Sequence, residues 1–297
     1  MSIIKSNLLL LLTAAIWGFA FVAQRVGMEN VGPFIFNGVR FMLGSLSLLP
    51  LIFYFRSDSQ SPEMSFKNAV MPGIVAGAVL FAGASLQQVG LVYTTAGKAA
   101  FVTGLYMVLV PLIGVFLRQP VERSNWLGCL LAVVGLYFLC IKEAAFIQWG
   151  DMLELIGALF WAIHILVIGH FSRRVDVLKL SCLQFLTCSV LSLMTAAFTE
   201  TIAAGSLIAA AVPILYGGLC SVGVAYTLQV VGQKYAPPAH AAIILSMETV
   251  FAVIGGYLLL GERMGGREIA GCLFMFSGLL ISQLRSLQTS KDEKVGL

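Results

Sequence analysis

Charged residues are scarce in this sequence of 297 residues. Lys, Arg, Asp and Glu make up 11% of the chain, whereas soluble domains carry roughly 25%. Hydrophobic residues make up 59%, and the mean hydropathy is +0.94. A soluble chain of this length needs far more charge to cover its surface, and disordered chains are also poorer in hydrophobic residues. The composition therefore predicts an integral membrane protein.

Sequence signatures of several other protein classes are missing. The six cysteines form no C-x-x-C pair and lie within apolar runs, so we expect reduced packing residues and no metal site. The chain has no H-E-x-x-H or G-x-S-x-G motif, and Gly97-Lys98-Ala99 lacks the remaining residues of a Walker A motif. The small, dispersed net charge of +4 disfavours nucleic-acid binding. The sequence therefore predicts a protein that is not an enzyme and has no cofactor and no nucleic-acid partner.

Ten apolar runs are long enough to cross a bilayer as helices, which takes about 20 residues each. Turn-forming residues separate them, such as Gly32-Pro33 before the second run and Pro237-Pro238 before the ninth. The runs cover residues 7–27, 33–55, 69–92, 96–117, 124–141, 150–171, 178–200, 207–232, 237–260 and 267–285. They leave no room for a soluble domain. We expect residues 1–297 to form a single all-α transmembrane domain of ten helices.

Lys and Arg residues in the connecting segments predict the orientation of the chain. If the N-terminus is cytoplasmic, twelve of them fall in inner segments and five in outer segments, and Arg40 lies within a span. The inner ones are Lys5, Arg56, Lys67, Arg118, Arg123, Arg173, Arg174, Lys179, Lys234, Arg285, Lys291 and Lys294. Because cytoplasmic loops carry an excess of positive charge, both termini are expected in the cytoplasm, with residues 286–297 as a cytoplasmic tail.

The sequence repeats itself at an offset of 142–144 residues. The matching pairs are Trp17 with Trp161, Gln87–Tyr93 with Gln229–Tyr235, and Gly128–Leu130 with Gly271–Leu273. We therefore expect two repeats, over residues 1–143 and 144–285. Each repeat holds five spans, an odd number, so the second repeat is inserted upside down relative to the first. Inverted repeats of this kind are typical of transporters that expose a central site to each side of the membrane in turn.

Four motifs together resemble those of the EamA-type transporters of the drug/metabolite transporter superfamily. They are Ala15–Phe19, Asn37-x-x-Arg40-Phe41, Gln88-x-Gly90-Leu91-x-Tyr93-Thr94, and Met247–Phe251 followed by Leu258–Glu262. The resemblance covers nearly the whole chain. It implies a ten-helix fold of two inverted five-helix repeats in a bacterial inner membrane, exporting small metabolites or amino acids. Many relatives have a proline after the glutamate of the ninth span, where this chain has Thr249.

Arg40, His164 and Glu248 stand out inside the apolar runs, where a charge costs at least about 2.5–3.5 kcal/mol. Glu248, near the middle of the ninth run, is either a proton carrier or a structural carboxyl between the repeats. Arg40 keeps its charge and binds a substrate carboxylate, pairs with Glu248 or anchors a helix end. His164 is either a hydrogen-bonded core residue or a group that titrates near neutral pH.

Polar and aromatic residues recur together at helical spacing on several spans. Trp17 and Gln24 share one helix face, and Tyr106, Tyr226 and Gln88 lie on similar mixed faces of other spans. Each alone is compatible with interhelical contact, but their recurrence favours a cavity for an amphipathic or zwitterionic solute. The candidate substrate-binding residues are Trp17, Gln24, Arg40, Gln88, Tyr106, His164, Tyr226 and Glu248.

These features together predict a secondary-active exporter, with a membrane-embedded enzyme or a channel as alternatives. Because no nucleotide site is present, the energy comes from an ion gradient or from the gradient of the substrate itself. Proton antiport through Glu248 or His164 is one hypothesis, and facilitated diffusion is the other. The expected partners are a small-molecule substrate, the lipid bilayer and protons, and a monomer is sufficient because it contains both repeats.

Overall fold

The computed structural model describes residues 1–55, 66–94, 96–119, 121–140, 148–201, 204–260 and 265–295. Within these ranges the chain forms helices and no strand. The first half contains α1 (Ile3–Gly27), α2 (Pro33–Tyr54), α3 (Phe66–Tyr93), α4 (Ala96–Gly104), α5 (Tyr106–Phe116) and α6 (Arg123–Cys140). The second half contains α7 (Trp149–Phe171), α8 (Val177–Thr199), α9 (Ala204–Ala209), α10 (Ala211–Leu215), the π-helix η3 (Tyr216–Tyr226), α11 (Thr227–Gln233), α12 (Pro238–Leu245), α13 (Glu248–Leu260) and α14 (Gly266–Val295).

Seven helical segments of the described chain are long and apolar enough to cross a membrane. They are Ile3–Gly27, Pro33–Tyr54, Phe66–Tyr93, Trp149–Phe171, Val177–Thr199, Ala211–Gln233 and Pro238–Leu259. Two shorter apolar helices, Phe101–Phe116 and Arg123–Leu139, correspond to the fourth and fifth predicted spans. The all-helical membrane architecture is thus confirmed for the described residues, and the count of ten spans stays a prediction.

The structure extends the predicted end of the tenth span and does not describe the predicted boundary between the repeats. α14 covers the tenth predicted span and continues beyond residue 285 to Val295. The boundary between the repeats at residues 143 and 144 lies outside the described residues. So do Arg56, Lys142 and Arg263, three of the charged residues used to predict the orientation.

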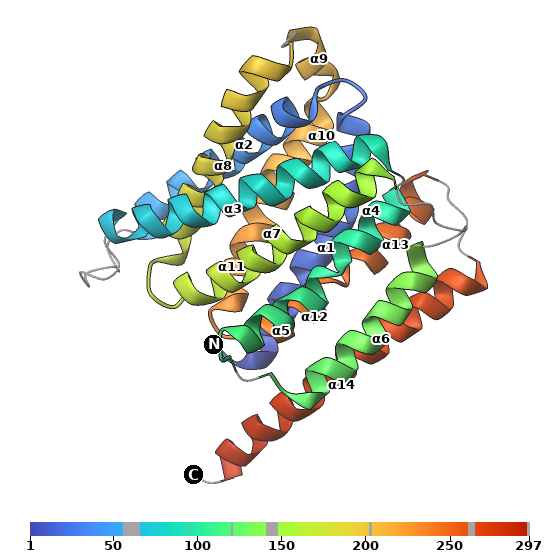
Figure 1. Cartoon of the computed structure of the whole chain (residues 1–297). Coiled ribbons are helices and arrows are strands. Elements are labelled where there is room, and N and C mark those ends of the chain that lie inside the picture. The colour runs from blue at the N-terminus through green and yellow to red at the C-terminus, as the bar shows by residue number, and fades with distance from the viewer. Residues whose placement is uncertain are drawn as a thin grey trace.

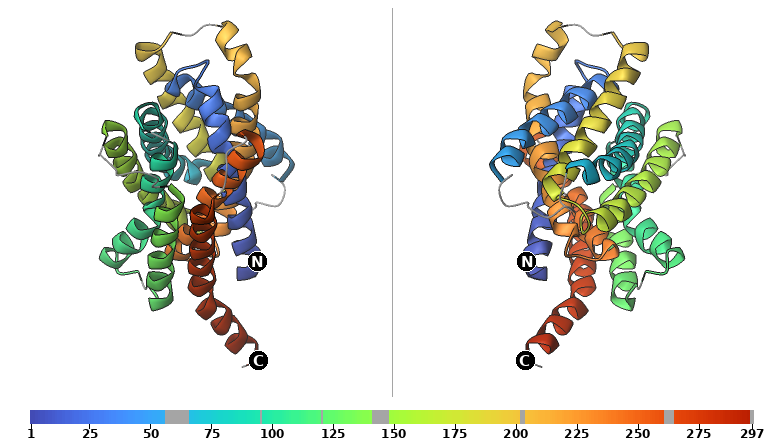
Figure 2. Two further views of the ribbon diagram at one scale, coloured as in Figure 1. Left: turned by 90° about the vertical axis from the view of Figure 1, so that its right-hand side faces the viewer. Right: turned by 90° about the vertical axis from the view of Figure 1, so that its left-hand side faces the viewer.

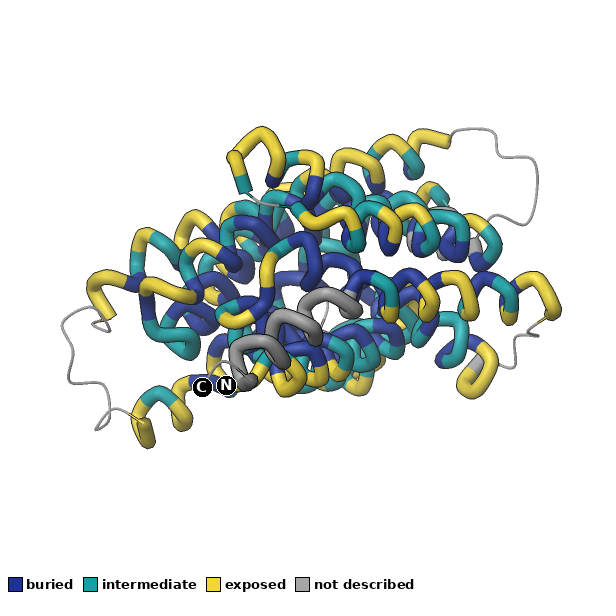
Figure 3. The backbone as a smooth tube through the Cα atoms, turned by 90° about the horizontal axis from the view of Figure 1, so that it is seen from below, coloured by how far each residue is buried: buried dark blue, intermediate teal, exposed yellow. Residues whose placement is uncertain are grey.

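The distribution of polarity is the reverse of that in a soluble protein. Large apolar side chains such as Phe198 and Phe116 are 89% and 86% exposed on the outside of the bundle. Gln88, Glu154 and His164 are fully buried in its interior. Figure 3 shows buried residues gathered along the middle of the bundle and exposed ones at its periphery. An apolar exterior of this extent fits a lipid environment.

The helices pack as a bundle in which both termini lie at the same end (Figure 2). α2 packs along α8, α3 packs along α7 and α8, and α1 packs along α13 and the π-helix. α6 and α14 form a pair at one side of the bundle (Figure 1). Segments from the two halves of the sequence therefore contact each other throughout the molecule.

Four glycines allow α6 and α14 to approach closely. A Cβ atom added to Gly128 would lie 2.7 Å from the carbonyl oxygen of Gly278, and one added to Gly278 would lie 2.6 Å from that of Gly128. Gly135 and Gly271 face each other in the same way, at 2.6 and 2.7 Å. Side chains at these positions would keep the backbones apart, as in other close helix contacts in membranes.

Replacing Gly135 by alanine is expected to push α6 away from α14, because the added methyl group would meet the backbone of Gly271. We expect this overpacking to cost about 1–3 kcal/mol of stability, measured as a lower melting temperature of the purified protein in detergent. Gly266→Ala is the matched control, since nothing lies within 4 Å of an added Cβ there. If both variants melt like the wild type, the close contact is wrong.

The fourth and ninth predicted spans are interrupted near their middles. α4 ends at Gly104 and α5 begins at Tyr106, while α12 ends at Leu245 and α13 begins at Glu248. At the second break, backbone hydrogen bonds of 3.1 and 3.2 Å reach back only three residues and tighten the turn. The break forms although Thr249 replaces the proline of many relatives. Each span therefore consists of two half-helices whose junction lies inside the bundle.

The eighth predicted span contains a stretch of widened helix. Its residues Tyr216–Tyr226 are π-helical. This conformation is rare in proteins, and where it occurs it is often found at functional sites. Two side chains of α1 donate hydrogen bonds to carbonyl oxygens of this stretch. Trp17 Nε1 donates to Ser221 at 3.2 Å, and Thr13 Oγ1 donates to Ala225 at 3.1 Å. These bonds hold α1 against the centre of the bundle.

Candidate functional site

Six of the eight residues singled out in the sequence line one cavity at the centre of the bundle. They are Trp17, Gln24, Arg40, Tyr106, Tyr226 and Glu248. The free volume of this cavity is about 40 Å³, which holds only a few water molecules. The described conformation is therefore closed around its centre, and a larger solute requires the cavity to expand.

The two helix breaks meet at this central cavity. Tyr106 is the first residue of α5, and Glu248 is the first residue of α13. The Tyr106 hydroxyl donates a hydrogen bond of 3.1 Å to Oε1 of Glu248. Both side chains are almost fully buried, with 4% and 8% of their surfaces exposed. Among the described residues, the Tyr106 hydroxyl is thus the hydrogen-bond donor to the Glu248 carboxyl in this cavity.

Arg40 brings a second ionisable group to the cavity wall. Its side chain is 3% exposed, and its Nε has no hydrogen-bond acceptor within the described chain. The guanidinium carbon lies 5.0 Å from the ring centre of Phe41 and 5.4 Å from that of Phe36. These aromatic contacts compensate only part of the cost of burying a charge. Arg40 can therefore accommodate an anionic group that enters the cavity.

Two tryptophans from matching positions of the repeats form much of the aromatic wall. The ring centre of Trp17 lies 4.5 Å from that of Tyr226, and the ring of Trp161 stacks with Tyr226 at 6.3 Å between ring centres. Trp161 Nε1 donates a hydrogen bond of 2.8 Å to Gln87. Each tryptophan thus bonds a helix of the other half of the sequence, since Trp17 bonds Ser221.

Gln88 and His164 do not line the central cavity. Gln88 is fully buried on α3, and both its amide oxygen and its amide nitrogen lack partners among the described residues. His164 lies behind Trp161 and Tyr226, with ring centres 6.1 and 6.3 Å away. Its Nε2 is 2.9 Å from Oε1 of Gln184. Both residues contribute to the buried interior rather than to the cavity surface.

Five further residues of the cavity lining are not among the eight candidate substrate-binding residues. Gln87, Thr103, Trp161, Ser221 and Gln229 all line the cavity. The sequence pattern pointed to three of these residues. Trp161 is the repeat partner of Trp17, Gln229 is the repeat partner of Gln87, and Thr103 lies one helical turn from Tyr106. A buried carboxyl group, Glu154, was missed because its position near the start of a span resembles that of an ordinary interfacial charge.

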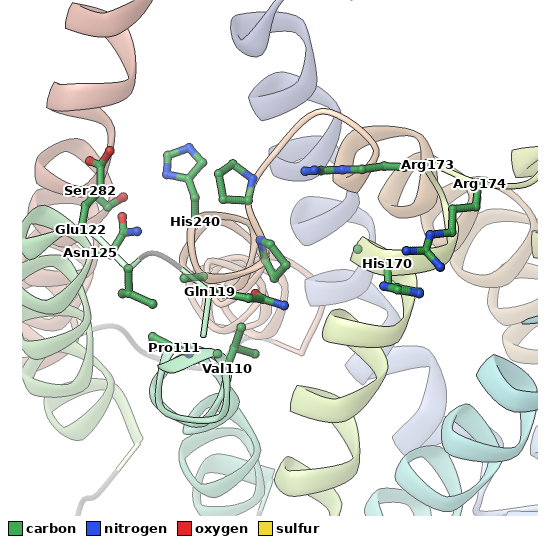
Figure 4. A pocket seen from close by; sticks show the side chains of 16 residues that line it. Val110, Pro111, Gln119, Glu122, Asn125, His170, Arg173, Arg174, His240 and Ser282 are labelled. Atoms are coloured by element: carbon green, nitrogen blue, oxygen red, sulfur yellow. The ribbon is translucent and has the colours of Figure 1, made fainter. Parts of the chain in front are cut away.

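A much larger pocket opens at the end of the bundle that carries both termini. Its volume is about 530 Å³, within the range of small-molecule sites. Arg173, Arg174 and His170 lie on one side of it, and Glu122 and Asn125 lie opposite (Figure 4). We refer to this pocket as the vestibule.

One apolar cluster contributes residues to the linings of both the vestibule and the central cavity. It includes Ile165 and Leu245, which line the central cavity, and Val110, which lines the vestibule. Val110 is one helical turn from Tyr106 on α5. Side chains of one apolar cluster therefore reach both the vestibule and the central cavity.

A membrane-embedded helical bundle with a polar cavity at its centre and a wide vestibule at one end has the architecture of a solute transporter. A model of the EamA-like transporter family matches residues 4–141 and 148–284 of the chain. The chain therefore belongs to the EamA-like transporter family, and it is a multi-pass membrane transporter.

Individual proteins support the same conclusion. An uncharacterized transporter of Archaeoglobus fulgidus is 33% identical over 284 residues, covering 94% of this chain and 86% of that protein. YoaV, an uncharacterized transporter of Bacillus subtilis, is 22% identical and covers 94% and 97%. A solved crystal structure with 17% identity matches 96% of this chain and 98% of its own with a TM-score of 0.77, which shows a shared fold.

Proposed function

We propose that the protein is a secondary-active exporter of small metabolites, with amino acids and related zwitterions as its substrate class. The contact between Tyr106 and Glu248 carries this proposal. These residues begin the second half-helices of the fourth and ninth spans, and they lie 142 residues apart, within the offset of the sequence repeat. Contact between equivalent positions supports a pseudo-two-fold axis that passes through the central cavity.

The pairing of α6 with α14 supports the inverted arrangement of the repeats. At an offset of 143 residues, Gly128 is equivalent to Gly271, and Gly135 is equivalent to Gly278. A two-fold exchange converts the contact of Gly128 with Gly278 into a contact of Gly271 with Gly135, which is also observed. Such reciprocity is typical of two-fold symmetric contacts. It favours ten spans arranged as two inverted five-helix repeats.

The positions of the two cavities support alternating access. With both termini in the cytoplasm of a bacterial cell, the vestibule faces inward, and Arg173 and Arg174 lie on the positively charged side. A cytoplasmic solute would enter the vestibule and displace the apolar cluster to reach the central cavity. Rocking of the repeats would then open the cavity to the outside.

The lining of the central cavity favours a zwitterionic solute. Arg40 can bind a carboxylate through two parallel hydrogen bonds, the geometry that guanidinium groups prefer. The faces of Trp17 and Trp161 can accept an ammonium group through cation–π contacts. The amides of Gln87 and Gln229 add neutral hydrogen-bonding groups at the same wall. A bare ion would use few of these groups.

Glu248 is the group through which we expect transport to couple to protons. A carboxyl inside a membrane protein commonly marks a proton or substrate pathway. Glu248 lies in the cavity itself, whereas His164 reaches it only through neighbouring aromatic rings. Proton antiport through Glu248 is therefore the mechanism we favour, with a subsidiary role for His164. Facilitated diffusion, driven by the gradient of the substrate, is the competing mechanism.

Counterflow in proteoliposomes tests the substrate class. Vesicles loaded with one unlabelled amino acid and diluted into a trace of its radiolabelled form should accumulate label if the protein carries that amino acid. We expect accumulation for at least one zwitterionic amino acid from a panel that also contains neutral sugars and nucleosides. Accumulation of sugars or nucleosides alone would contradict the proposal, and protein-free vesicles provide the background.

A further inference from the structure

A second carboxyl group is buried between the central cavity and the start of α7. Glu154 has 0% of its surface exposed, and its Oε2 accepts a hydrogen bond of 2.6 Å from the Thr103 hydroxyl. Its Oε1 has no partner among the described residues. The carboxyl occupies space beside Gly90 of α3, where an added Cβ atom would lie 2.7 Å from Oε1. Oε1 of Glu154 therefore packs against Gly90 and accepts no hydrogen bond from a described residue.

Among the described residues, the groups that face Glu154 do not neutralise a negative charge. Asp151, one turn earlier on the same helix, is the charged residue of the described chain that lies near it, and a negative charge there disfavours an ionised Glu154. α3 contributes the backbone of Gly90, and α4 contributes the hydroxyl of Thr103. Burying a carboxylate with one hydrogen bond and no cation among the described groups is costly, whereas a carboxylic acid is neutral and can donate a hydrogen bond from Oε1.

Neighbouring groups connect Glu154 to the central cavity in one direction and to the surface in the other. Thr103 lines the central cavity and lies one turn before Tyr106, which bonds Glu248. Asp151 lies one turn before Glu154, at the partly exposed start of α7, where it accepts hydrogen bonds from Thr94 Oγ1 and the backbone N–H of Gln148. Oxygen groups therefore lead from the end of α7 to the cavity.

We propose that Glu154 is a proton-binding site that exchanges protons between the surface at Asp151 and the central cavity. The proposal rests on the proton coupling assigned above to Glu248. In the described hydrogen-bond direction, the Thr103 hydroxyl would pass its proton to Oε2 of an ionised Glu154 while it accepts one from a hydronium ion in the cavity, which leaves a water molecule, the hydroxyl and a neutral carboxylic acid. After the hydroxyl rotates, a proton on Glu154 moves the opposite way.

In the proposed topology, this path connects the external side of the membrane with the central cavity. Asp151 lies at the external end of α7, while the vestibule faces the cytoplasm. Glu248 would then receive protons from outside through Glu154 even when the cavity is closed to external solutes. Substrate and proton would then use separate routes to the same cavity.

Infrared difference spectra of the full chain in lipid, recorded between low and high pH, test the proton site directly. We expect two buried carboxyl groups to contribute carbonyl bands of protonated acids in the wild type. Glu154→Gln should remove one band, and Glu248→Gln should remove the other. Glu200→Gln is the matched control and should remove neither, since Glu200 bonds the backbone of Phe34 and Ile35 elsewhere in the bundle.

Thr103→Val keeps the carboxyl group and provides a second variant in case Glu154→Gln does not fold. It should shift the Glu154 band, because Oε2 loses its donor, and leave the Glu248 band in place. Spectra in which neither Glu154→Gln nor Thr103→Val alters a carboxyl band would overturn the proposal. So would a single altered band that Glu248→Gln also removes.

Transport assays distinguish proton exchange through Glu154 from a purely structural role of this residue. Glu154→Gln is expected to abolish accumulation driven by an imposed pH gradient and to retain solute counterflow, which needs no net proton movement. Equal loss of both would assign Glu154 a structural role. If Glu248→Gln leaves gradient-driven transport intact while the Glu154 band is lost as described, the coupling role of Glu248 fails and the proton site at Glu154 stands.

Discussion

Arg40→Gln is expected to weaken the binding of carboxylate-bearing solutes by about 10- to 100-fold. Charge-assisted hydrogen bonds contribute about 1.5–3 kcal/mol each, and 1.4 kcal/mol corresponds to a factor of ten in affinity. The buried guanidinium lines the central cavity, and its Nε has no described acceptor. An incoming carboxylate would therefore find a donor that is already desolvated. The half-saturating concentration in counterflow measures the effect.

Arg40→Lys serves as the matched variant for this prediction. Lysine keeps the positive charge but lacks the planar fork that binds both carboxylate oxygens, so an intermediate loss of affinity is expected. Solutes without a carboxylate should bind Arg40→Gln about as well as they bind the wild type. If carboxylate-bearing solutes keep their affinity in Arg40→Gln, the arginine is a helix anchor and not a substrate contact.

Glu248→Gln is expected to eliminate the response of transport to a pH gradient. The amide has nearly the same size and can still accept a hydrogen bond from Tyr106, but it cannot bind and release a proton. Counterflow should persist, because it exchanges one solute molecule for another without net proton movement. Accumulation with and without an imposed gradient, in vesicles containing each protein, provides the measurement.

Tyr106→Phe is the control for Glu248→Gln. It removes the hydrogen bond to the carboxyl and leaves the carboxyl itself in place, so it should alter the pH at which coupling is half-maximal without abolishing coupling. A Glu248→Gln protein that accumulates solute in response to the gradient as the wild type does would contradict the role of this residue and favour facilitated diffusion.

The positions of the long helices could be predicted from the sequence because bilayer thickness sets their length and hydrophobicity marks their extent. The breaks in the fourth and ninth spans could not. No proline marks the turn at Ser246-Met247, and the tight turn there depends on hydrogen bonds between backbone groups. The π-helix of the eighth span was not predicted either, and the contacts of its carbonyl oxygens with Trp17 and Thr13 exist only in the folded chain.

Individual site residues were harder to predict than helices, because the direction of a side chain turns by about 100° with each residue of a helix. Gln88 was predicted to face the cavity, but its neighbour Gln87 does so. His164 was chosen as a titratable group inside an apolar run, yet its side chain contacts Gln184 and does not line the cavity. Arg40 and Glu248 were found because a charge far inside an apolar run is costly and therefore conspicuous.

Transport in proteoliposomes under an imposed pH gradient tests the central claim most directly. Purified protein is reconstituted with the amino acid that gives the strongest counterflow, and accumulation of its radiolabelled form is followed with the gradient present or collapsed by an ionophore. We predict accumulation that requires the gradient in the wild type and is lost in Glu248→Gln. Accumulation that is equal in both proteins and indifferent to the gradient would contradict proton-coupled transport through the central cavity.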